Sequence, residues 1–71
     1  MTNKVFYKQV GGKHYKKFSI QPSQFINKNK LLFAEGNVIK YVTRHQDKGK
    51  IADIKKAIHY LEMIIERDYS E

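Results

Sequence analysis

The sequence contains no cysteine and no tryptophan, and its 71 residues include one proline and four glycines. Without cysteine, the chain can form neither a disulfide nor a thiolate metal site. No apolar run approaches the roughly 20 residues that a membrane-spanning helix needs. The first residues also lack the apolar centre of a signal peptide. These absences predict a soluble intracellular protein that has no contact with a membrane.

Acidic residues are absent from the first 34 positions, where seven lysines occur, and all seven acidic residues lie from Glu35 onward. The formal net charge of the chain is +7, and its isoelectric point is about 9.7. Such an excess of positive charge predicts an anionic partner, which can be a phosphorylated small molecule or a nucleic acid. The charge by itself does not choose between these two classes.

The residue patterns of several common active sites are also missing. His14, His45 and His59 are scattered, and the sequence has neither an HExxH motif nor the paired-carboxylate pattern of a metal site. No serine lies in a nucleophile-elbow pattern. We therefore expect no metal site and no cofactor, and we assign no catalytic residue.

The pattern of apolar and polar residues predicts an all-α fold in a single small domain, residues 1–71. A basic arm at 1–20, irregular or partly extended, precedes a short helix at 22–29 and an antiparallel hairpin of two helices at 31–46 and 51–68. A chain of this length buries only about 60% of its unfolded surface, so its core is small. We therefore expect a homo-oligomer.

Two positions bear on where the first two helices begin. Pro22 suits the first position of the short helix, which Phe25 and Ile26 would anchor. Gly36 allows two interpretations of the second helix. Either Gly36 lies inside the helix and permits close approach of a neighbour, or the helix begins at Asn37, with that residue as its N-cap.

The third helix carries an apolar seam with the spacing 3, 4, 3, 4, which is typical of helices that pack along their length. Ala57 and Ile64 widen this seam, and this favours packing in a bundle. We expect oligomerisation through the seam. Gly49 precedes the helix and is interpreted as a C-cap or a turn residue. The seam residues are Ile51, Ile54, Ile58, Leu61 and Ile65.

The most informative segment runs from Gly36 to Arg44. On a helix, the spacing i, i+3, i+4 and i+7 places Asn37, Lys40, Tyr41 and Arg44 on one face. Guanidinium and ammonium groups bind phosphate, and a tyrosine ring can stack on a base. The face therefore suits a phosphorylated planar ligand. The alternative is that Tyr41 packs in the core and that the cations are solvated.

A second candidate cluster lies in the basic arm, where Gly11-Gly12 precedes Lys13, His14 and Tyr15. Glycine-rich loops can aim backbone N–H groups at phosphate, although the spacing here is not that of a Walker A motif. The alternative is a flexible basic loop. Lys48, in the turn after the second helix, adds further positive charge.

A third cluster lies on the last helix, where Asp53, Lys56 and Tyr60 share a face. Asp53 could orient a cation of the second helix across the hairpin, or it could contact a ribose hydroxyl. It could equally be an acid that favours the first turn of a helix.

Several segments occur along the chain in a characteristic order. They are His14-Tyr15, Gln21-Pro22 with Phe25-Ile26, Gly36 to Arg44, Lys48, and Asp53 to Leu61. In these segments the chain resembles, over about residues 13–65, a family of small tailed-bacteriophage proteins that is classed as a domain of unknown function.

One member of that family is a nucleotide kinase that acts on deoxynucleoside monophosphates, and it is much longer than this chain. The resemblance implies a phage origin, a nucleotide-related role and a location in the cytoplasm of the infected bacterial host. No catalytic residue is carried across by it, and Mg²⁺ would be needed only if this chain were also a kinase.

Three functions follow as hypotheses. The first is a non-catalytic protein that binds a nucleotide or a nucleotide-derived signal, which a phage could use to sequester a host defence signal. The second is a small nucleotide kinase, and the third is a nucleic-acid-binding protein. The missing Walker loop and acidic cluster favour the first. The expected ligand-binding residues are Lys13, His14, Tyr15, Asn37, Lys40, Tyr41, Arg44 and Lys48.

Overall fold

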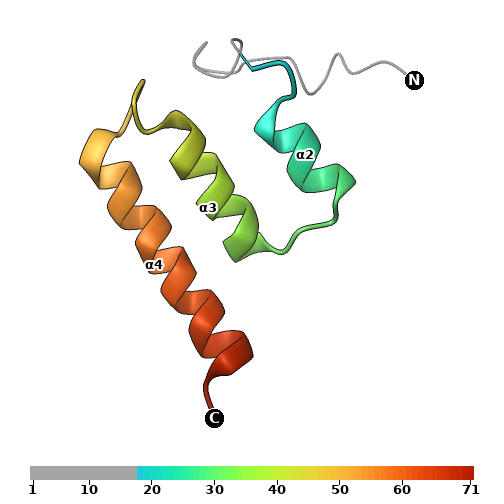
Figure 1. Cartoon of the computed structure of the whole chain (residues 1–71), viewed down its shortest axis with the longest axis vertical. Helices are drawn as coiled ribbons and strands as arrows, with labels where there is room; N and C mark the ends of the chain where they lie inside the picture. The colour runs from blue at the N-terminus through green and yellow to red at the C-terminus, as the bar shows by residue number, and fades with distance from the viewer. Residues whose placement is uncertain (1–17) are drawn as a thin grey trace.

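The computed structural model describes residues 18–71, which form three helices (Figure 1). They are α2 (Pro22–Lys28), α3 (Phe33–Arg44) and α4 (Lys50–Tyr69). The predicted all-α class, a short helix followed by an antiparallel helical hairpin, is confirmed. Most of the predicted basic arm, including Lys13, His14 and Tyr15, lies outside the described residues.

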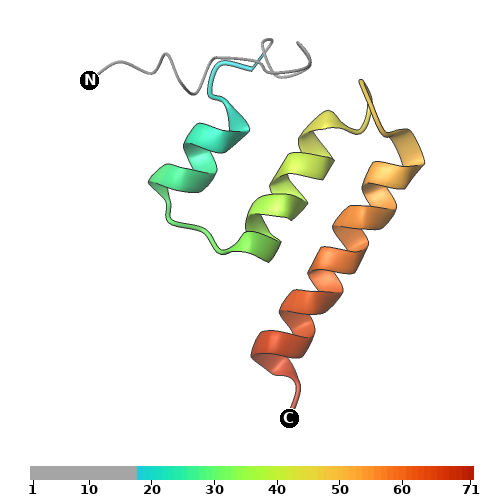
Figure 2. The same ribbon diagram turned by 180° about the vertical axis from the view of Figure 1, so that it is seen from behind.

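Helix α3 lies between α2 and α4, and it runs antiparallel to α4, as both views of the ribbon show (Figures 1 and 2). Its 12 residues span about 18 Å, whereas the 20 residues of α4 span about 30 Å. The C-terminal part of α4 therefore extends past the beginning of α3 (Figure 1). The turn between the two helices brings the end of α3 beside the start of α4.

Helix α2 begins with Pro22 in its first turn, where the missing N–H of proline is not needed. It ends in a Schellman arrangement, in which the N–H of Leu31 donates to the carbonyl of Ile26 at 3.1 Å. Lys30 lies just past the C-cap, Asn29, and has a φ of 54°. Glycine is the usual residue at such a position, so a lysine here adopts a strained backbone conformation.

Gly36 lies in the interior of α3, because the helix begins at Phe33 with Leu32 as its N-cap. The alternative in which the helix begins at Asn37 is therefore wrong. A Cβ on Gly36 would lie 3.1 Å from Cγ2 of Ile26, so the glycine permits the close approach of α2. Ile26 is half-buried here, whereas Phe25 remains 47% exposed. Of the two predicted anchors of α2, Ile26 is the one in this contact.

The face that α4 turns toward α3 differs from the predicted seam. Asp53 and Ala57 are buried, and Tyr60 and Ile64 are half-buried. These residues lie on average about a third of a turn away from the seam. The rotation follows from the contacts that α3 makes, because its Tyr41 and Arg44 meet Tyr60 and Asp53 rather than aliphatic side chains.

The hydrophobic core of residues 18–71 is small, and its buried members are Ala34 and Ala57. Much larger apolar side chains stay exposed, including Phe33 at 75% and Ile51 at 65%. None of the three helices combines the length and the apolar character required to cross a membrane.

Candidate functional site

An ion pair joins the end of α3 to the start of α4. Nε of Arg44 donates to Oδ2 of Asp53 at 2.9 Å, and Nη2 donates to Oδ1 at 3.2 Å. The Arg44 side chain is 12% exposed and that of Asp53 is 1% exposed. This two-pronged geometry is the strong form of an arginine–carboxylate contact. The structure therefore confirms that Asp53 orients a cation of α3 across the hairpin.

Gly49 completes this arrangement from the turn. Its N–H donates to Oδ2 of Asp53 at 3.0 Å, and a Cβ on Gly49 would lie 2.0 Å from Oδ1. Gly49 is the N-cap of α4 and has a φ of −90°, while His45 is the C-cap of α3. Of the two interpretations of Gly49, the turn residue is confirmed and the C-cap is wrong. Glycine is needed because a side chain would displace the Asp53 carboxylate.

The Arg44 guanidinium holds the pKa of Asp53 below its ordinary value of 3.8. Desolvation acts in the opposite direction, and the Gly49 N–H and the charge of Lys56 support Arg44 in lowering it. Asp53 is consequently ionised at neutral pH. Its chemistry is that of a fixed anion that holds Arg44, and it is not suited to giving up a proton near pH 7.

Three cationic groups surround the ring of Tyr41. Cζ of Arg44 lies 4.6 Å from the ring centroid, and the Nζ atoms of Lys40 and Lys56 lie at 5.5 Å and 5.3 Å. The ring of Tyr60 stacks on Tyr41, with the centroids 6.0 Å apart and an angle of 11° between the planes. We call these five residues, Lys40, Tyr41, Arg44, Lys56 and Tyr60, the Tyr41 cluster.

The Tyr41 cluster lies in the most positively charged part of the hairpin. Residues 40–56 contain six lysines and arginines and two aspartates, so their formal net charge is +4. Any two of the three cationic groups lie within about 11 Å, twice the largest distance to the ring centroid. Attraction to the ring faces offsets part of the repulsion between like charges. An anion placed among these groups would offset more of it.

The structure brings together Lys40, Tyr41 and Arg44 among the predicted binding residues. The Asn37 amide donates to the Phe33 carbonyl of its own helix at 2.9 Å, so one of its two donors is engaged by the backbone. Lys48 lies exposed in the turn between the helices. Lys13, His14 and Tyr15 fall outside the part of the chain that the structure describes.

The predicted set of binding residues omitted Lys56 and Tyr60, which α4 contributes to the Tyr41 cluster. The signal for both was present in the sequence, since they follow Asp53 by three and seven residues and so share its helix face. Knowing that Asp53 pairs with Arg44 would have placed this face against α3. In residues 18–71, no group of three or more His, Asp or Glu side chains is arranged to hold a metal ion.

Comparison with known proteins identifies the family. A family model described as a protein of unknown function, DUF3310, matches residues 10–62, which include the Tyr41 cluster and the Arg44–Asp53 pair. No curated protein and no solved structure matches the chain. The match covers 53 of the 71 residues. The chain therefore belongs to the DUF3310 family of proteins of unknown function.

Proposed function

We propose that this protein binds a nucleotide, or a signal derived from one, at the Tyr41 cluster. The observation that carries the proposal is the convergence of Lys40, Arg44 and Lys56 on one aromatic ring at 4.6–5.5 Å. Ammonium and guanidinium groups in this arrangement form charge-assisted hydrogen bonds to phosphate oxygens. Their spacing suits one phosphate or a short chain of phosphates.

The residues of the cluster have different roles in this proposal. Lys40 and Lys56 are exposed and supply the ammonium groups that contact phosphate. The Arg44 guanidinium presents its fork to Asp53, so it adds positive charge and holds the hairpin rather than gripping phosphate through that fork. Tyr41, backed by Tyr60, keeps the cations together. Tyr15 and His14, from the arm that precedes the helices, are proposed to contact the base.

The distribution of charge favours a compact ligand over an extended nucleic acid. Residues 40–56 carry +4, whereas residues 57–71 contain four acidic residues and one arginine and carry −3. A nucleic acid that followed the length of the hairpin would meet repulsion at the far end of α4. A single nucleotide would meet only the positive end.

The role that we propose is binding without turnover. Asp53 is the acid next to the cluster, and it is engaged by Arg44 and by the Gly49 N–H, which suits it to a structural task. In a phage protein, such binding could sequester a nucleotide signal from host defence. The kinase and the nucleic-acid binder are the competing outcomes of the experiment.

The test is a thermal-shift and calorimetric titration of the full chain with nucleoside mono-, di- and triphosphates and cyclic dinucleotides, followed by chromatography of the mixture. A ligand at 100 times its Kd should stabilise the protein by about 2.7 kcal/mol. We expect Lys40→Ala and Lys56→Ala each to weaken binding ten- to a hundredfold, about the loss of one charged hydrogen bond. Lys28→Ala, which removes an exposed lysine of α2, is the matched control.

A rise in melting temperature with the nucleotide recovered unchanged supports binding without turnover. Conversion of a nucleoside monophosphate to the diphosphate in the presence of ATP and Mg²⁺ would mean that the protein is a nucleotide kinase. Binding of oligonucleotides but not of single nucleotides, with an affinity that falls steeply as salt increases, would mean that the protein binds nucleic acid. Equal weakening by Lys28→Ala and Lys56→Ala would show that net charge, not the Tyr41 cluster, carries the binding.

A further inference from the structure

Helix α4 has an apolar surface wider than the one that α3 covers. Beside the face turned toward α3 lies the seam defined above, and four of its five residues are exposed. Ile51 is 65% exposed, Ile58 51%, Leu61 46% and Ile65 59%. A row of large aliphatic side chains along four turns of one helix is typical of a surface that packs against another element.

The spacing of the seam indicates what kind of element fits it. Residues spaced at 3, 4, 3, 4 form a stripe that winds only slowly around an α-helix and can accept the side chains of another α-helix between them. In heptad terms, Ile51, Ile58 and Ile65 occupy a positions, and Ile54 and Leu61 occupy d positions. Lys55 and Glu62 then occupy successive e positions, at the edge of the stripe.

The charges along α4 indicate the direction of the partner helix. Residues 50–58 contain three lysines and one aspartate and carry +2, whereas residues 59–69 contain three acids and one arginine and carry −2. An antiparallel copy of the same helix places each half beside the opposite charge. A parallel copy would place like halves together, with Lys50 next to Lys55 of the second copy.

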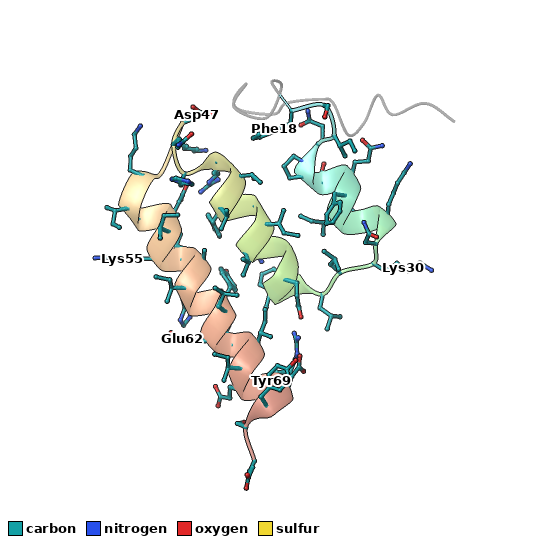
Figure 3. All side chains as sticks on the ribbon, in the orientation of Figure 1. Phe18, Lys30, Asp47, Lys55, Glu62 and Tyr69 are labelled. Atoms are coloured by element: carbon teal, nitrogen blue, oxygen red, sulfur yellow. The ribbon has the colours of Figure 1, made fainter. Side chains whose placement is uncertain are left out.

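We infer that a second copy of this chain docks antiparallel along the α4 seam, which gives a two-fold symmetric dimer of hairpins. The register that fills the seam sets Ile58 against Leu61 of the second copy and Ile54 against its Ile65. The same register brings Lys55 near Glu62 of the second copy, twice by symmetry. Figure 3 shows Lys55 and Glu62 on the side of α4 that points away from α3.

This dimer leaves the Tyr41 cluster open. Lys56 precedes Ile58 by two residues, which corresponds to about 200° around the helix. The seam and the cluster therefore lie on opposite sides of α4. As a result, the dimer can be tested independently of nucleotide binding, and failure of one proposal does not decide the other.

The test is an exchange of charges, read by sedimentation equilibrium of the full chain. Lys55→Glu or Glu62→Lys alone turns both edge pairs from attraction to repulsion, and each should raise the dimer Kd about tenfold. The double variant Lys55→Glu/Glu62→Lys restores opposite charges and should return the Kd close to that of the wild type. Lys28→Glu in α2 and Glu71→Lys past the end of α4, which change the net charge away from the seam, are the matched controls.

A monomer at all concentrations would overturn the inference. So would a dimer that the single variants and their controls weaken equally, or one that the double variant fails to restore. Recovery in the double variant cannot arise from general unfolding or from net charge, because it depends on the two positions facing each other.

Discussion

At the residue scale, one carboxylate connects three parts of the hairpin. Asp53 accepts two hydrogen bonds from Arg44 at the end of α3 and one from the Gly49 N–H in the turn. Replacing Arg44 by alanine would leave this buried acid without its main partner. Arg44→Ala is therefore expected to lower stability, which makes Lys40 and Lys56 the better positions at which to test ligand binding.

The lowered pKa of Asp53 predicts a pH dependence of stability. Its pKa in the folded chain is below the ordinary value of 3.8, so the unfolded chain binds its proton more readily. The stabilisation is complete above about pH 4 and is lost as the pH falls toward the lowered pKa. Urea titrations from pH 7 to pH 3 should show this loss.

Asp53→Asn should be less stable than the wild type at pH 7 and should change less between pH 5 and pH 3. Arg67 also lowers the pKa values of Glu35 and Asp68. These two groups add the same pH dependence to the stability of the wild type and of Asp53→Asn. Glu66→Gln removes an exposed acid from the same helix and should leave the pH profile unchanged. A parallel profile for Asp53→Asn and wild type would contradict the role of Asp53.

At the element scale, the stability of α2 depends on its C-terminal cap as much as on its packing against α3. Its seven residues are too few to form a stable helix alone, so its hydrogen-bonded C-cap and its contact with α3 matter. Ile26 takes part in both, through its carbonyl and through its side chain against Gly36. The strained residue in this arrangement is Lys30.

Lys30→Gly should raise the free energy of unfolding by roughly 0.5–1 kcal/mol, because glycine adopts a positive φ without steric cost. Lys28→Gly, two residues earlier and inside the helix, should lower it by roughly the same amount. Urea denaturation of both variants measures the difference. Destabilisation by both would mean that the lysine side chain, not the backbone, matters at position 30.

At the scale of the whole molecule, residues 18–71 bury little apolar surface and leave many large apolar side chains exposed. Their buried hydrophobic residues are two alanines, while four of the five aliphatic residues of the α4 seam remain exposed. Small domains with such limited cores commonly gain stability from a second subunit. The dimer inferred above would bury the seam and extend the core across two hairpins.

If the dimer contributes to stability, the melting temperature should rise with protein concentration, by roughly 3–6 °C for each tenfold increase. Ile58→Glu should remove this dependence, because it places a charge in the seam of each copy. Circular dichroism melts at several concentrations provide the measurement. A melting temperature that does not change with concentration in the wild type would argue against the dimer.

The sequence alone predicted the helices well because each has its own local signal. Pro22 suits the start of α2, Gly49 falls in the turn before α4, and the apolar residues recur with a helical period. It also predicted that Lys40, Tyr41 and Arg44 share a face, since spacing on a helix determines this. The order of several segments predicted membership of a family of unknown function, and the match of residues 10–62 to the DUF3310 family shows such membership. The phage origin stays a prediction.

Only the tertiary structure decided how α4 is rotated against α3. An apolar stripe wider than one neighbour can cover has two ways to pack, and periodicity does not choose between them. The contacts of Arg44 with Asp53 and of Tyr41 with Tyr60 made the choice. These contacts brought Lys56 into the Tyr41 cluster and left most of the seam exposed. A polar pair and a stacked pair between α3 and α4 form only at one rotation of the two helices, and no local signal in the sequence encodes that rotation.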